Sequence, residues 1–237
     1  MKALLFAAGK GTRLKPFTDS HPKALARVNG KTLLERNLLY LQSYGIQDFV
    51  INLHHFGDQI RQYLKEHNNF GANIDFSDES KSLLETGGGL LFAKERLQNE
   101  KHFLIMNADI LTDLNIDAFL NHHENKEALV TLAVSDRNSS RKLLFNKQMV
   151  LQGWRNISTG EERLSTASEE LRELAFSGIH CMDSRFLERM GRRGKFSIMD
   201  EYLDQMKEGI IQGFEHSAKL VDVGRPESVL EAEKYFK

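Results

Sequence analysis

The chain has 237 residues, of which 41% are hydrophobic and 27% are charged, so it is a globular chain long enough to bury a sizeable core. Its formal net charge is −1, which excludes the basic excess that nucleic-acid binders use to neutralise phosphates. We therefore expect no nucleic-acid partner.

The first half of the chain alternates short apolar runs with helical patterns. We predict strands at residues 2–8, 48–53, 73–77 and 102–106, and helices at 32–44, 56–66 and 90–97. Between the first strand and the first helix, residues 9–31 lack periodicity and hold two of the three prolines. A loop of that length inside a compact domain is usually functional. Strands that alternate with helices favour a mostly parallel sheet with helices on both faces, an α/β fold.

The second half has a different pattern. Short strands are predicted near 128–134, 142–146, 149–153 and 174–181, with a polar stretch at 155–172, and helices near 183–190, 198–208 and 226–236. Consecutive strands without helices between them indicate antiparallel elements, so this half is expected to be α+β.

The strongest local signal is the run LFAAGKGTRLKPFT at residues 5–18, followed by PKAL at 22–25. Gly9 and Gly11 leave room for backbone amides to approach a ligand closely. Anion-binding side chains surround them: Lys10, Thr12, Arg13, Lys15 and Lys23. Leu14 stands where a dinucleotide fingerprint needs glycine or alanine, and no GK[ST] ending of a Walker loop is present. The segment indicates a triphosphate-binding loop, and the alternative is a tight glycine turn with solvated lysines.

This run resembles the signature of the sugar-phosphate nucleotidyltransferases, in which an apolar strand ends in AAGxGTRLxPxT and a PKxL element follows. Residues 7–18 and 22–25 match that signature nearly position by position, with Phe17 where leucine is usual. The resemblance implies a Rossmann-like fold and transfer of a nucleotide from a nucleoside triphosphate to a sugar 1-phosphate. It also implies one domain over 1–237, with a nucleotide-binding half at 1–127 and a sugar-binding half at 128–237.

The resemblance assigns roles to the loop residues. It implies nucleotide contacts from Ala7, Ala8, Gly9, Gly11, Thr12, Arg13 and Lys23. Arg13 would stabilise the departing pyrophosphate, and Lys23 the charge that grows on the α-phosphoryl oxygens. Together with Asp109 they form the implied catalytic set.

Two aspartates follow strands, Asp109 the strand predicted at 102–106 and Asp222 a further short strand near the end of the sequence. Open α/β sheets bind ligands at the carboxyl ends of their strands. Asp109 ends the run Asn107-Ala108-Asp109, and Asp222 lies in LVDVGRPE at 220–227. The resemblance makes both of them ligands of a catalytic magnesium ion, Mg2+, although Ala108, Leu220 and Arg225 depart from the family pattern. Two carboxylates suit magnesium, which keeps several waters and accepts phosphate oxygens.

Further contacts are implied elsewhere. The run ETGGG, residues 85–89, would border the pocket for the nucleobase and the sugar. The implied nucleotide contacts are Glu85, Thr86, Gly87 and Gly88. The alternative is that this run is a flexible segment that leads into a helix. Sugar contacts are implied for Asn107, for Gly178 in FSGIH, and for Lys195 in GKF. Lys195 is equally interpreted as a solvated loop lysine.

The substrates follow from the wider resemblance. Chain length, ETGGG, FSGI and GKF together resemble the N-acetylmuramate 1-phosphate uridylyltransferases, which predicts UTP and N-acetylmuramate 1-phosphate as substrates. Mannose or heptose 1-phosphate guanylyltransferases, which use GTP, share most of these motifs. A catalytically silent homologue that binds a nucleotide is the alternative outside enzymes, and the joint presence of Arg13, Lys23, Asp109 and Asp222 argues against it.

Compartment and assembly are the last expectations. The single cysteine, Cys181, cannot form an intramolecular disulfide, which fits a reducing compartment, so we expect a cytoplasmic protein. No stretch approaches the roughly 20 apolar residues needed to span a bilayer, so no membrane partner is expected. A monomer or a small homo-oligomer is expected.

Overall fold

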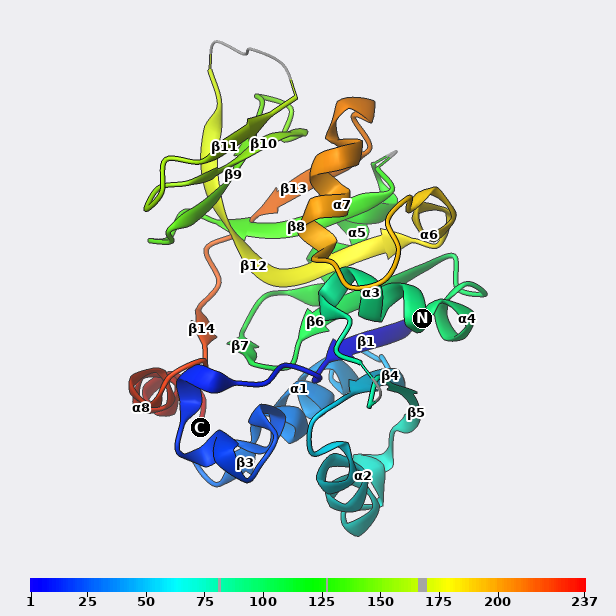
Figure 1. The fold of residues 1–237 in the computed structure, drawn as a ribbon, viewed down its shortest axis with the longest axis vertical. Coiled ribbons are helices and arrows are strands. Elements are labelled where there is room, and N and C mark those ends of the chain that lie inside the picture. Colours follow the sequence, from blue (N-terminus) through cyan, green and yellow to red (C-terminus); the bar gives the residue numbers. More distant parts are fainter. Residues whose placement is uncertain (81, 127, 166–169) are drawn as a thin grey trace.

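The computed structural model describes residues 1–80, 82–126, 128–165 and 170–237. Its centre is one mixed sheet of ten strands, with helices packed against it (Figure 1). The first half contributes four parallel strands: β1 (Lys2–Phe6), β4 (Asp48–Leu53), β5 (Asn73–Asp78) and β6 (His102–Asn107). The helices of this half are α1 (Leu33–Gln42), α2 (Gly57–Glu66), α3 (Glu85–Phe92), α4 (Lys94–Leu97) and α5 (Ile116–Glu124).

The second half extends the sheet with mostly antiparallel strands. They are β8 (Val130–Ser135), β9 (Arg141–Phe145), β10 (Leu151–Asn156), β11 (Glu162–Leu164), β12 (Arg172–Asp183) and β13 (Ile211–Glu215). The long strand β12 pairs with β6, β8 and β9, and in Figure 1 it curves from the central sheet toward β9, β10 and β11. The helices here are α6 (Arg185–Arg189), α7 (Ile198–Gln205) and α8 (Pro226–Tyr235).

Burial on both sides of the sheet explains the continuous apolar runs of the central strands. In β1, Leu4 packs in one core cluster with Leu90 of α3, whereas Leu5 packs in another with Leu38 of α1. All four side chains are fully buried. The predicted α/β fold, with a parallel core and antiparallel strands in the second half, is confirmed. Within the described residues, no helix is long and apolar enough to cross a membrane.

Some elements differ from the sequence-based expectation. The segment 9–31 is not structureless, because it contains short 3-10 turns and a two-stranded ladder of β2 (Arg27–Val28) and β3 (Lys31–Thr32). Helix α3 begins at Glu85, so the glycines of ETGGG lie inside the helix and not ahead of it. The polar stretch 155–172 contains β11, and its residues 166–169 lie outside the described part of the chain.

A second small ladder lies beyond the carboxyl end of β6. It joins β7 (Ile110–Thr112) to β14 (Leu220–Asp222) in antiparallel register, with Asp222 opposite Ile110. The pairing bridges more than a hundred residues of sequence and connects the middle of the chain to its last segment. It determines where the predicted carboxylates lie.

Candidate active site

The site lies at the carboxyl ends of β1 and β6. Phe6, the last residue of β1, pairs with Asn52 of β4 on one side and with Asn107 of β6 on the other. The strand order therefore reverses at β1, since the chain places β4 and β5 on one side and β6 on the opposite side. In open α/β sheets the crevice beyond such a reversal is where ligands bind.

A buried hydrogen-bond network anchors the first two residues of the glycine loop. The side-chain oxygen of Asn52 accepts hydrogen bonds from the backbone N–H groups of Ala7 (2.6 Å) and Ala8 (3.2 Å). The Asn52 amide nitrogen donates to Glu79 Oε1 at 2.8 Å, and the backbone N–H of Leu84 donates to Glu79 Oε2 at 3.1 Å. Burial raises the pKa of Glu79, whose side chain is almost inaccessible, while both hydrogen bonds oppose that shift.

The two loop glycines have different roles. Gly11 has a φ of +60°, and a Cβ added there would lie 2.9 Å from Thr18 Cγ2 and 3.0 Å from Lys23 Cβ. The Thr18 hydroxyl donates to the Gly11 carbonyl at 2.9 Å, which closes the turn. Gly9 is exposed, and an added Cβ would contact nothing within 4 Å. Gly11 therefore shapes the loop, whereas Gly9 keeps its backbone open. Thr12 is exposed in the short turn that follows.

The β7–β14 ladder brings the two predicted carboxylates to this loop. Val223 N–H donates to the Asp109 carbonyl at 2.9 Å, so both aspartates lie on neighbouring backbone segments. The Lys23 ammonium donates to Asp109 Oδ2 and lies 3.8 Å from Asp222 Oδ1. Arg13 Nη2 lies 4.0 Å from Asp222 Oδ2. The structure thus brings Arg13, Lys23, Asp109 and Asp222 together.

This donor set fits magnesium. Magnesium in phosphate-transfer sites typically takes one or two carboxylates and completes its shell with water and substrate oxygens. Asp109 and Asp222 supply two carboxylates that face one common point, the Lys23 ammonium. Among the described residues there is no group of three or more histidine, cysteine, aspartate or glutamate side chains that could hold a metal ion. Two carboxylates suit a cation that completes its shell with water and substrate phosphate oxygens.

Two predicted nucleotide contacts have another role in the structure. The backbone N–H groups of Gly87 and Gly88 donate to the Phe196 carbonyl, at 2.9 and 3.3 Å. A Cβ added at Gly88 would lie 2.2 Å from the Gly194 carbonyl oxygen. Both glycines therefore let α3 pack against the segment before α7, and both N–H groups donate to the same carbonyl of the protein. Thr86 remains at the cavity edge, where its hydroxyl accepts from Ile198 N–H at 3.0 Å.

The predicted sugar contacts separate into two places. Gly178 has a φ of +75°, at a register shift in β12, and its added Cβ would lie 3.1 Å from Asn107 Nδ2. Gly178 and Asn107 are thus neighbours. Lys195 instead lies on the surface, with its ammonium 3.5 Å from Glu85 Oε1.

Two adjoining cavities open at this edge of the sheet. The loop cavity, of about 370 Å³, is lined by Gly9, Glu79, Glu85 and Asp109 among others. The large cavity, of about 520 Å³, lies between the β9–β11 strands and α7. The two share these lining residues: Phe6, Thr86, Asn107 and Ser197. A ligand whose phosphates lie at the loop can therefore extend its other end into the large cavity.

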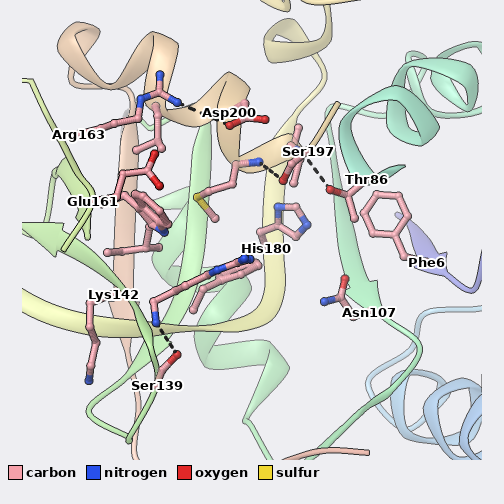
Figure 2. A pocket seen from close by; sticks show the side chains of 17 residues that line it. Phe6, Thr86, Asn107, Ser139, Lys142, Glu161, Arg163, His180, Ser197 and Asp200 are labelled. Carbon is pink, nitrogen blue, oxygen red and sulfur yellow. Dashed lines mark hydrogen bonds and ion pairs between the residues drawn. The ribbon is translucent and has the colours of Figure 1, made fainter. Parts of the chain in front are cut away.

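Figure 2 shows the large cavity, with Glu161 and Arg163 on one side and Phe6, Thr86 and Asn107 on the other. His180 lines it but is buried, and burial lowers its pKa to about 3, so the ring stays neutral. Its Nδ1 hydrogen-bonds the Tyr202 hydroxyl, which occupies one ring nitrogen. This histidine is a fixed wall group rather than a proton carrier.

Sequence reasoning missed several residues of the site. Asn52 carried a signal, because a polar residue near the end of a buried strand also marks Asn107. No sequence signal marks the other missed residues, which are Glu79, Arg141 and Trp154. An acid in a polar stretch, an arginine at the start of a strand and a half-buried tryptophan are common in any chain.

Comparison with known proteins gives one family match and full-length structural likeness. The model of the family described as nucleotidyl transferase matches residues 2–143. The N-acetylmuramate alpha-1-phosphate uridylyltransferase of Neisseria meningitidis is 41% identical over 118 residues, which is 50% of this chain and 51% of that relative. The match thus spans about half the length of that relative.

A second uridylyltransferase of the same description, from Caulobacter vibrioides, is 28% identical over 237 residues, covering 98% of this chain and 95% of that relative. Among solved structures, HddC from Yersinia pseudotuberculosis complexed with GMP-PN superposes with a TM-score of 0.79 at 22% identity, covering 100% of this chain and 99% of that one. At that identity the likeness establishes the fold.

Proposed function

The chain belongs to the nucleotidyl transferase family, as a sugar-phosphate nucleotidyltransferase, and on that premise we propose that it couples UTP to N-acetylmuramate 1-phosphate. The observation that carries the proposal is the meeting of Asp109 and Asp222 at Lys23, beside the glycine loop and next to a cavity of about 520 Å³. The two uridylyltransferases described above support the choice of base and sugar.

The reaction is an in-line exchange at the α-phosphorus. An oxygen of the sugar 1-phosphate forms a bond to that phosphorus, the bond from it to the bridging oxygen of the β-phosphate breaks, and pyrophosphate leaves. Such a transfer needs little covalent help from a protein, so positioning and neutralisation of charge dominate.

The side chains of this site have separate tasks. Asp109 and Asp222 would hold magnesium, which when bound neutralises phosphate charge. Gly9 presents open backbone to the phosphates, and Lys23 balances negative charge where the reacting phosphates meet. Arg13 is exposed at the mouth of the site, where the departing pyrophosphate carries its charge. Asn107, which lines both cavities, faces the sugar side, and Gly178 lies beside it.

Pyrophosphate release tests the proposal. UTP, GTP, CTP, dTTP and ATP are each paired with N-acetylmuramate, N-acetylglucosamine, mannose and glucose 1-phosphates in the presence of magnesium. We expect the highest kcat/KM for UTP with N-acetylmuramate 1-phosphate. Release only with GTP and mannose 1-phosphate would replace the proposed substrates and keep the reaction. No release with any pair, in protein that still binds a triphosphate, would identify a silent homologue.

A further inference from the structure

The large cavity is lined by an arginine whose side chain has no partner among the described residues. Its lining includes three basic side chains, Arg141, Lys142 and Arg163, and two acidic ones, Glu161 and Asp200. Two of the three cations are already engaged by the protein. The Lys142 ammonium donates to the Arg137 carbonyl at 2.7 Å, and Figure 2 shows it directed away from the other labelled residues.

Arg163 is engaged more strongly. Its guanidinium donates to Asp204 at 2.9 Å and lies 3.6 Å from Asp200. Arg141, at the start of β9, differs from both, because its guanidinium makes no hydrogen bond or ion pair with any other residue in the described part of the chain. An arginine that lines a ligand cavity with all of its donors free is suited to a planar, bidentate anion.

We propose that Arg141 selects a sugar 1-phosphate that carries a carboxylate on its ring substituent, by pairing its guanidinium with that carboxylate. The inference rests on the proposed function, in which the phosphate of the sugar lies at Asp109 and Asp222. The loop cavity holds that phosphate end, so a group that reaches Arg141 belongs to the far side of the sugar.

The acidic side of the cavity also contains the positive charge of Arg163. Asp200 faces Arg163, and Glu161 lies two residues from Arg163 on the same short stretch of chain. Figure 2 shows Glu161 beside Arg163, whose positive charge lowers the attraction of this carboxylate for an ammonium group. Glu161 would accept hydrogen bonds from sugar hydroxyls. Among the described residues that line the cavity, Arg141 is the cation whose side chain has no protein partner.

The test is a coupling experiment between one side chain and one substrate group. N-acetylmuramate 1-phosphate carries the carboxylate, N-acetylglucosamine 1-phosphate lacks it, and glucosamine 1-phosphate carries an ammonium group instead. kcat/KM is measured for each sugar with UTP in the wild type, Arg141→Gln and Arg141→Lys. Arg172→Gln is the matched control, since Arg172 is an exposed arginine of β12 that pairs with Glu215 and does not line the cavity.

We expect Arg141→Gln to lower kcat/KM about 10- to 100-fold for the carboxylate sugar and less than about 3-fold for the neutral sugar, as for loss of a charged hydrogen bond. Arg141→Lys should restore part of the loss, because it keeps the charge without the planar fork. The affinity of the Arg141→Gln protein for the carboxylate sugar, measured by calorimetry without UTP, should weaken in parallel. Arg172→Gln should change neither kcat/KM for the two sugars nor this affinity.

Equal losses for both sugars in Arg141→Gln, or a wild-type preference for the ammonium sugar, would overturn this inference and leave the proposed function intact. No turnover of any sugar 1-phosphate by the wild type would remove the proposed function, and the inference with it. The two failures therefore have different signatures.

Discussion

At the scale of single residues, the site is a balance of opposite charges around Lys23. Lys23 is buried, and its ammonium meets one carboxylate from the end of β6 and one from the end of β14. Arg13 adds a second positive charge at the exposed edge. Without substrate, the two aspartates balance the charges of Lys23 and Arg13. When phosphates bind, they can take the place of the aspartates beside these cations, so the buried ammonium of Lys23 keeps a partner.

Asp109→Asn tests the carboxylate at the centre of this balance. The amide keeps the shape of the side chain but loses the charge, so we expect kcat to fall on the order of 100- to 1,000-fold, comparable to loss of one transition-state electrostatic contact. Steady-state pyrophosphate release measures the effect, and an unchanged melting temperature verifies the fold. A kcat within a few-fold of wild type would remove Asp109 from the catalytic set.

Asn52→Ala tests the anchoring of the glycine loop. The variant leaves the Ala7 and Ala8 N–H groups without their acceptor, and an unsatisfied buried donor costs about 1–3 kcal/mol. We expect KM for the triphosphate to rise about 10-fold because the loop loses its fixed entry. Asn73→Ala is the control, since Asn73 is an exposed asparagine whose side chain donates to Asp48 and does not contact the glycine loop in the described part of the chain. Equal KM values for the triphosphate in the two variants would show that Asn52 does not position the glycine loop for binding.

At the scale of elements, the packing of α3 against the segment before α7 decides the shape of both cavities. Gly88 belongs to this contact, because its N–H donates to the Phe196 carbonyl and a Cβ added to it would lie 2.2 Å from the Gly194 carbonyl oxygen. Thr86 and Ser197, which line both cavities, lie at the two sides of the same contact. A change here alters the walls of the site without touching the reacting groups.

Gly88→Ala tests this contact. The added methyl group would lie 2.2 Å from a backbone oxygen, so the two elements must separate, and we expect the free energy of unfolding to fall by about 1–3 kcal/mol. Urea unfolding measures the loss. Gly191→Ala is the matched control, because a Cβ added at Gly191 contacts nothing within 4 Å. Equal stability of the two variants would contradict the packing role of Gly88.

Some elements of the fold can be predicted from the sequence and others cannot. The strand at 48–53 was predicted with its observed bounds, because a buried strand has a local signature of continuous apolar residues. The family signature at residues 7–18 and 22–25 includes Lys23, which lies beside Asp109 and Asp222 in the structure. The ladder of β7 with β14 has no local signature, since its two short strands gain stability only from each other across the chain.

Two further features of the site could not be predicted from the sequence for the same reason. The glycines at 87–89 have low helix propensity, so sequence favours a loop there, and the close approach of residues 194–196 offsets that cost. Glu79 is an unremarkable acid in sequence, and only the folded chain shows that it holds Asn52 and the Leu84 amide. Both features depend on contacts between segments far apart in sequence.

At the scale of the whole molecule, buried histidines make stability depend on pH. Burial lowers the pKa of His123 to about 4 and that of His180 to about 3. The unfolded chain binds these protons near pH 6.5, so the folded state is favoured above that pH and loses stability as pH falls toward 4.

We expect the free energy of unfolding to drop by roughly 2 kcal/mol for each of the two histidines between pH 7.5 and pH 5. Urea unfolding at both pH values measures the change, and His123→Gln should remove the roughly 2 kcal/mol that this histidine contributes. His21→Gln should leave it unaltered, because His21 is exposed. A stability that rises on acidification would contradict the burial of neutral rings.

The ladder of β7 with β14 also ties the glycine loop to the last segment of the site. Val221 and Val223 share one core cluster with Leu14, from the turn after Gly11, and with Val28 of β2. Loss of this ladder would therefore displace Asp222 and at the same time uncover part of the core on which the phosphate-binding loop rests.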